Sequence, residues 1–280
     1  MKASSVILLY DSARRGPPAL DELRELYRYR NLIGQLVRRD ITTRYKRSAL
    51  GIAWTMLNPL GMMLIWTLAF SQVFGKMGGM VGYPAYVLNG LLAWTFFSQT
   101  TTAAMVNFVW GGNLLNRIYI PRSSFALSAV GTGIVNILLS LIPLLLVMLF
   151  VGLPVRLEAI WFVPLAIFLL ACFALGLGLL LSTLAVFFPD VAEMYQIVLQ
   201  AWMFLTPIMY SEEILPEAWR FWLTNLNPMY HLVKLFRIPL YGGRLPNAAE
   251  LLIPVGLSVV MLLVGWFAFT SKSDEFAYRL

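Results

Sequence analysis

The chain has 280 residues, of which 59% are hydrophobic and only 12% are charged, and its mean hydropathy is +0.74. Soluble domains carry about 25% charged residues, so this composition excludes a water-soluble enzyme and indicates a membrane protein. The single cysteine, Cys172, excludes an internal disulfide and a cysteine-based metal site, and the single histidine, His231, disfavours a histidine-based one. We therefore expect no metal site.

Long uncharged stretches predict six transmembrane helices, because a bilayer core requires about 20 consecutive apolar helical residues. The predicted spans lie near residues 51–74, 84–110, 124–151, 159–187, 194–210 and 250–270. We expect an all-α integral membrane protein with two parts. These are a cytoplasmic N-terminal region, residues 1–49, and a six-helix transmembrane domain, residues 50–280.

The distribution of basic residues predicts the orientation of the chain in the membrane. More than half of the 21 lysine and arginine residues precede the first predicted span, which places the N-terminus in the cytoplasm. With six spans, the C-terminus is cytoplasmic too. The apolar run from Val6 to Tyr10 is too short for a signal peptide, and no small-residue cleavage site follows it, so we expect none.

An amphipathic helix is predicted between Leu23 and Ile41, where apolar side chains recur at helical spacing and Arg24, Arg28 and Arg39 fall on the opposite side. We expect it to lie on the cytoplasmic membrane surface; the alternative is a solvated, charged tail. A basic cluster beside the first span is ordinarily a topology signal and an anchor to anionic lipid. A second hypothesis is that this cluster holds the phosphates of an anionic substrate. Its members are Arg38, Arg39, Arg44, Lys46 and Arg47.

Residues 211–249 contain two helical pieces that are each too short to span a bilayer, separated by Asn227-Pro228. This pattern predicts a re-entrant external hairpin. An interfacial cap without a functional role is the alternative interpretation.

The predicted spans contain no Asp, Glu, Lys or Arg apart from Glu250 at an edge. Ion-coupled carriers place ionisable groups at mid-membrane, so the sequence disfavours a self-powered carrier. The chain also lacks a G-x-x-x-x-G-K-[ST] phosphate loop, which indicates no nucleotide site of its own. A transport function would therefore need a separate subunit to supply energy.

The fifth predicted span combines aromatic rings with amide and hydroxyl side chains. Such a mixture suits a passage for sugars, which stack on rings and hydrogen-bond to amides; an interfacial aromatic belt is the other interpretation. The residues concerned are Tyr195, Gln196, Gln200, Trp202, Phe204, Thr206 and Tyr210.

Several motifs together resemble the membrane subunits of type-two ABC exporters for polysaccharides and polyol phosphates. A tyrosine and basic residues precede a Leu-Gly-x-x-Trp-x-x-Leu-x-Pro signature in that family, and the stretch from Arg44 to Pro59 is similar to it. The resemblance covers nearly the whole chain in order, although the family commonly has an arginine where Pro189 stands. The other matching segments are residues 120–122, 188–191, 206–210, 227–232 and 274–280.

The resemblance implies a homodimer that assembles with two copies of a cytoplasmic ABC ATPase subunit in the bacterial inner membrane. The implied cargo is O-antigen, teichoic acid or a related glycan on an undecaprenyl-diphosphate lipid, as in lipopolysaccharide biosynthesis. The chain itself would not be an enzyme and would hold no catalytic residue or cofactor, since ATP and Mg bind the partner subunit. Membrane lipid is an expected partner, and nucleic acid is not.

Three groups of site residues are expected. The substrate passage comprises Trp54, Trp66, Tyr195, Gln196, Gln200, Trp202, Phe204 and Tyr210. The lipid diphosphate would dock on Arg38, Arg39, Arg44 and Arg47. The ATPase subunit would contact Arg24, Arg28, Asn113, Asn116, Arg117, Tyr119 and Pro121.

Three rival functions remain open at this point. One is a type-two ABC permease for a drug or a small lipid. Another is an integral membrane enzyme acting on lipid-linked sugars, and the third is a membrane scaffold without transport.

Overall fold

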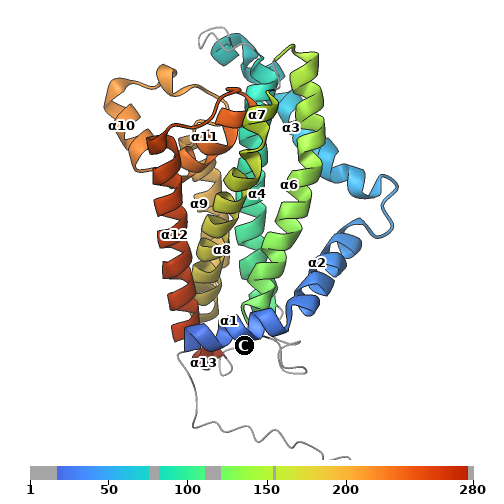
Figure 1. Cartoon of the computed structure of the whole chain (residues 1–280), viewed down its shortest axis with the longest axis vertical. Coiled ribbons are helices and arrows are strands. Elements are labelled where there is room, and N and C mark those ends of the chain that lie inside the picture. Colours follow the sequence, from blue (N-terminus) through green and yellow to red (C-terminus); the bar gives the residue numbers. More distant parts are fainter. Residues whose placement is uncertain (1–17, 76–81, 111–120, 154–155, 277–280) are drawn as a thin grey trace, which may run out of the picture.

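In a computed structural model of the chain, the structure describes residues 18–75, 82–110, 121–153 and 156–276. These residues form helices joined by turns and loops and contain no β-strand. Five long helices of this part of the chain run side by side along the long axis of the molecule (Figure 1): α4 (Tyr83–Trp110), α6 (Ser124–Phe150), α8 (Val163–Phe187), α9 (Val191–Leu205) and α12 (Ala248–Ser271). A further helix, α3 (Trp54–Phe70), runs obliquely to them.

Shorter helices lie at the two ends of this bundle (Figure 1). The α-helical ones are α1 (Pro18–Arg28), α2 (Arg30–Tyr45), α7 (Leu157–Ile160), α10 (Glu217–Asn225), α11 (Pro228–Leu240) and α13 (Ser273–Phe276). Two 3₁₀ turns, η1 (Gly51–Ala53) and η3 (Glu212–Ile214), and a π-helical turn, η2 (Ser71–Gly75), complete the described elements.

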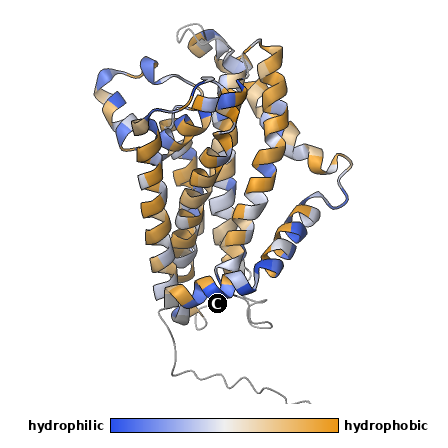
Figure 2. Cartoon of the chain, in the orientation of Figure 1, coloured by the Kyte–Doolittle hydropathy of each residue, from blue (hydrophilic) through white to orange (hydrophobic). Residues whose placement is uncertain are grey.

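Four helical segments of the described chain are long and apolar enough to cross a membrane: Gly51–Phe74, Ser124–Phe150, Leu157–Phe187 and Ala248–Ser271. They coincide with four of the predicted spans, and Figure 2 shows that their residues are predominantly hydrophobic. Helix α4 has comparable length but carries a hydroxyl- and amide-rich run from Ser98 to Thr102.

The fifth predicted span, 194–210, is shorter in the structure than expected. Helix α9 has 15 residues and ends at Leu205. Thr206 takes an extended conformation (φ −99°, ψ 129°) because the ring of Pro207 disfavours a helical residue before it.

Helices α8 and α12 pack at backbone distance, at Gly176 and Gly265. A Cβ atom on Gly265 would overlap the backbone of Gly176, and one on Gly176 would overlap the backbone of α12 at Met261. Small residues permit such close approach, and dispersion contacts then hold membrane helices together. Gly178 of α8 similarly faces Ala104 of α4, so α8 lies tightly between α4 and α12.

The predicted amphipathic helix between 23 and 41 is present as two helices, α1 and α2, which break at Tyr29 (φ −95°, ψ 17°). Helix α1 lies across the end of the bundle that carries the C-terminal helix α13, and α2 rises obliquely beside it (Figure 1). Both mix polar and apolar side chains (Figure 2). The carboxylate of Glu22 on α1 accepts hydrogen bonds from Ser123, the residue before α6.

Helices α10 and α11 lie at the opposite end of the bundle (Figure 1). Asn227 begins α11: its side-chain oxygen accepts from the backbone N–H of Met229 (3.0 Å), and Pro228 occupies the first helical position. Helix α11 buries most of its apolar side chains against α4, α8 and α12. Helix α10 instead exposes aromatic rings, such as Trp219 and Trp222.

Candidate functional site

A cavity of about 1060 Å³ lies between α2, α3, α4 and α6. Its wall is unusually polar for a bundle of apolar helices. Helix α3 contributes Thr55 and Asn58, and α6 contributes Thr132, Asn136 and Ser140. Helix α4 contributes Thr95, Ser98, Gln99, Thr100 and Asn107.

Helical spacing places these polar side chains on common faces. On α6, Thr132, Asn136 and Ser140 recur every four residues and therefore lie above one another. On α4, Thr95, Gln99 and Asn107 repeat at the same interval or a multiple of it. Two polar stripes therefore face the same space.

Two hydroxyl groups in this wall lack hydrogen-bond partners among the described residues. They are the Oγ1 atoms of Thr100 and Thr132, and both residues are buried. Gly133 allows α6 to approach α4 here, because a Cβ atom at that position would overlap the Thr100 hydroxyl. The hydroxyl and amide groups along the cavity wall favour a hydrated or hydroxyl-rich occupant over an apolar one.

On one side, the cavity is bounded by the amphipathic helix α2 and the turn that follows it. Arg44 of α2 lines the cavity together with Asp40, which pairs with Arg39 at 3.0 Å. Arg47 turns the chain toward η1 in the left-handed region (φ +67°), followed by Gly51 (φ +49°). Arg38, Arg39, Arg44 and Arg47 are all exposed, and Arg44 is the one that lines the cavity.

The residues predicted for the substrate passage occupy three different settings. Trp54 lines the cavity and is half exposed. Two aromatic contacts join α3 and η2 to α9 and the loop after it. Trp66 stacks on Phe204, with ring centroids 6.4 Å apart, and Phe74 contacts Tyr210 at 6.0 Å.

Helix α9 separates the remaining passage candidates onto opposite faces. Tyr195 is buried, and its hydroxyl pairs with the Thr101 hydroxyl at 2.7 Å. Trp202 packs against Trp94 of α4 and Phe97. Gln196 and Gln200 are exposed. The passage role of these residues stays a prediction.

The residues predicted to contact an ATPase lie partly within the described chain. Arg24 and Arg28 are exposed on α1, and Arg24 pairs with Asp21 at 3.4 Å. Pro121 is buried just before α6. Asn113, Asn116, Arg117 and Tyr119 lie outside the described residues.

The polar stripes of α4 and α6 are functional candidates that the sequence analysis did not identify. The sequence contains two features that could have identified them: the Ser98-Gln99-Thr100 run, and Thr132, Asn136 and Ser140 spaced four residues apart in a largely apolar segment. Within the described ranges, no group of three or more His, Cys, Asp or Glu residues is arranged to hold a metal ion. The cavity wall offers hydrogen bonds without an evident acid–base pair, which suits binding and passage of a hydrophilic solute.

Comparison with known proteins identifies the family. The ABC-2 type transporter family matches residues 31–241. The chain is 33% identical to the O-antigen export system permease protein RfbA of Myxococcus xanthus, covering 91% of this chain and 97% of that protein. A Klebsiella pneumoniae RfbA is 27% identical, with coverages of 88% and 94%.

More distant relatives carry related names. The polysialic acid transport protein KpsM of Escherichia coli is 24% identical over 84% of this chain and 91% of its own length. The family match covers more than half of the chain, and the apolar helices agree with it. The chain is thus a multi-pass membrane protein that belongs to the ABC-2 type transporter family.

Proposed function

We propose that this chain is the membrane permease subunit of an ATP-driven exporter, which moves an undecaprenyl-diphosphate-linked polysaccharide across the bacterial inner membrane. The observation that carries the proposal is the polar cavity within an apolar helical bundle, with Arg44 in its wall. A hydrophilic polymer needs such a surface, because hydrocarbon offers no replacement for its bonds to water. Two relatives are named as an O-antigen export system permease and a polysialic acid transport protein, and these names support the same class of cargo.

The proposed topology has six spans, with α4 and α9 as the second and fifth. Helices α1 and α13 share one end of the bundle, whereas α10 and α11 lie at the other (Figure 1). The positive charge of residues 18–49 assigns the first end to the cytoplasm, so both termini are cytoplasmic. In this arrangement α10 and α11 form a re-entrant external hairpin, and α1 is a surface helix.

The proposed assembly contains two copies of this chain and two of a cytoplasmic ABC ATPase, which binds ATP and Mg. Helix α3 is the surface that we propose for the contact with a second copy, because only 6% of its apolar segment is buried within this chain, against 22–67% for the other three apolar spanning segments of the described chain. Arg24 and Arg28 on α1 and the connection that ends at Pro121 would dock the ATPase.

The proposed mechanism assigns a separate task to each surface. Arg38, Arg39, Arg44 and Arg47 attract the lipid diphosphate at the cytoplasmic leaflet. Hydroxyl and amide groups of α4 and α6 exchange hydrogen bonds with the sugars. The exposed ring of Phe204, stacked on Trp66, offers weak contacts along which a polymer slides without being trapped.

The test is reconstitution with a co-purified ATPase in proteoliposomes, followed by addition of lipid-linked glycans. We expect a stoichiometric ATPase subunit and ATP hydrolysis that rises with glycan. Absence of such a partner under gentle extraction would contradict the exporter and favour an enzyme or a scaffold. Stimulation by a drug or a small lipid alone would favour the rival permease.

A charge-removing variant tests the docking step. Arg44→Ala combined with Arg47→Gly should reduce export and leave assembly intact, since glycine adopts the left-handed backbone of position 47 without strain. Arg156→Ala, an exposed arginine before α7, is the matched control. Normal export in the double variant would contradict diphosphate docking on these arginines.

A further inference from the structure

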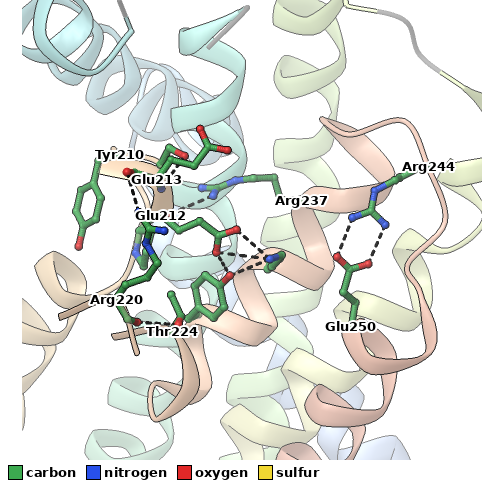
Figure 3. A network of polar contacts seen from close by, with 12 residues as sticks. Tyr210, Glu212, Glu213, Arg220, Thr224, Arg237, Arg244 and Glu250 are labelled. Atoms are coloured by element: carbon green, nitrogen blue, oxygen red, sulfur yellow. Dashed lines mark hydrogen bonds and ion pairs between the residues drawn. The ribbon is translucent and has the colours of Figure 1, made fainter. Parts of the chain in front are cut away.

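A second pocket, of about 200 Å³, lies at the end of the bundle that carries α10 and α11. It is formed by α11, the start of α4 and the segment around η3. Among the described residues, three cationic side chains line it, Lys234, Arg237 and Arg244, and one carboxylate, that of Glu212. Figure 3 shows Glu212 and Arg237 in this region and Arg244 paired with Glu250 beside it.

Glu212 already occupies the cationic side of this pocket. Its carboxylate accepts a hydrogen bond from the Tyr230 hydroxyl and pairs with the Lys234 ammonium at 3.1 Å. The same ammonium donates to the Tyr230 hydroxyl at 2.8 Å, so both donors converge on one carboxylate. Glu212 belongs to a three-residue 3₁₀ turn, and its side chain is 38% exposed. This exposure leaves the same donors within reach of a ligand arriving from solvent.

Arg237 forms the floor of the pocket and is held in place by neutral groups. Its guanidinium donates to the carbonyl oxygens of Pro207 (3.1 Å) and Ile208 (3.2 Å) and lies 3.7 Å from the ring centroid of Tyr86. Gly90 of α4 leaves room for it, because a Cβ atom there would come within 2.5 Å of Nη2.

The charge of Arg237 is not neutralised by an ion pair within the described chain. Its Nε atom is buried and has no hydrogen-bond partner among the described residues. Arg244, by contrast, pairs with both oxygens of Glu250, at 2.7 and 2.8 Å, and this carboxylate raises the pKa of the Arg244 guanidinium. Lys234 is thus paired with Glu212 and Arg244 with Glu250, whereas the positive charge of Arg237 has no paired carboxylate within the described chain.

We propose that this pocket binds the carboxylate of an acidic sugar in the exported glycan, and that Glu212 occupies the site in its absence. The donors already hold a carboxylate, which favours that group as the ligand. The rings of Tyr86 and Tyr241, 5.3 Å apart and edge to face, line the same space and offer a surface for one sugar unit. The assignment of the ligand to a glycan rests on the proposed function.

The site can be tested with monosaccharides, without transport. Full-length protein in phosphatidylcholine nanodiscs is titrated with glucuronate and with glucose, and binding is followed by saturation-transfer NMR. Glu212→Ala should bind glucuronate at least about tenfold more tightly than the wild type, because the competing carboxylate is removed. Glucose binding should not change. Adding Lys234→Met should abolish the gain in glucuronate affinity.

Glu213→Ala is the matched control, since this neighbouring carboxylate is exposed and does not line the pocket. An unchanged glucuronate affinity in folded Glu212→Ala, or an equal gain for glucose, would overturn the site. Loss of glucuronate binding only in nanodiscs containing phosphatidylglycerol would assign the pocket to a lipid headgroup and overturn the sugar assignment. Glucuronate binding without glycan-stimulated ATP hydrolysis would contradict the proposed function and leave the pocket intact.

Discussion

The carboxylate of Glu22 accepts two hydrogen bonds from Ser123, one from its backbone N–H at 3.0 Å and one from its hydroxyl at 2.6 Å. A residue of α1 thus supplies the anionic partner at the N-terminus of α6, where unpaired N–H groups and the helix dipole favour negative charge. The contact ties the surface helix to a membrane helix 101 residues away in sequence. Movement of α1 would therefore be transmitted directly to α6.

Glu22→Ala is expected to destabilise this connection by about 1 kcal/mol, the usual cost of losing a capping side chain. The thermal midpoint in detergent should fall, and trypsin should cleave faster after Arg28 as α1 detaches. Asp21→Ala is the control, because Asp21 pairs with the exposed Arg24 on the helix surface. A double-mutant cycle with Ser123→Ala measures the coupling, and additive effects would contradict the contact.

The glycine contact between α8 and α12 leads to a second prediction. Gly265→Ala should destabilise the bundle by about 1–3 kcal/mol, because the added methyl group forces the two backbones apart. Gly256→Ala on the same helix meets nothing within 4 Å and should be neutral or stabilising by up to about 1 kcal/mol. Thermal unfolding of both variants in one detergent provides the comparison. Equal midpoints would contradict the close packing.

Hydropathy alone located most of the long helices, because a bilayer imposes a minimum apolar length that the sequence displays directly. Two helix boundaries were harder to predict from the sequence. The end of α9 was signalled by Thr206-Pro207, but the apolar residues beyond it extended the predicted span to 210. The break between α1 and α2 at Tyr29 has no local proline or glycine, so no sequence signal marks it.

The candidate site was harder to predict than the fold. Polar residues on α4 and α6 were visible in the sequence, but their importance depends on which faces meet across the cavity. That arrangement is set by tertiary packing, such as the approach of α6 to α4 at Gly133. The composition of α9 predicted a passage role for Tyr195 but not its burial, because the rotation of the helix that buries this ring is set by tertiary packing.

Asn227 provides a third prediction, because one side chain satisfies four groups. Its oxygen accepts from the Trp202 indole N–H (2.8 Å) and the Met229 N–H, and its amide donates to the Leu205 carbonyl and the Thr206 hydroxyl. Asn227→Ala should cost about 1–3 kcal/mol for each buried group left unpaired.

The thermal midpoint of Asn227→Ala is compared with that of Asn225→Ala, an exposed residue at the end of α10. Asn227→Asp should be intermediate, because a carboxylate still accepts both hydrogen bonds but donates none. If alanine and aspartate were equally tolerated, the network would not stabilise the junction of α9 and α11.

A hydroxyl inside the cavity and one outside it allow an effect on transport to be distinguished from an effect on stability. Thr132→Val keeps the side-chain shape and removes a hydroxyl that has no partner in the described chain, so stability should stay equal or increase. Export in reconstituted vesicles should nevertheless fall several-fold, because this buried hydroxyl would become a hydrogen-bond partner for the substrate once the cavity widens to admit it. Thr183→Val is the reverse case: this hydroxyl bonds the Leu179 carbonyl at 2.9 Å and does not line the cavity. We expect that variant to lose up to about 1 kcal/mol and to export normally. Equal export by both variants would show that the polar stripe of α6 serves packing, since only a substrate in the cavity distinguishes the two hydroxyls.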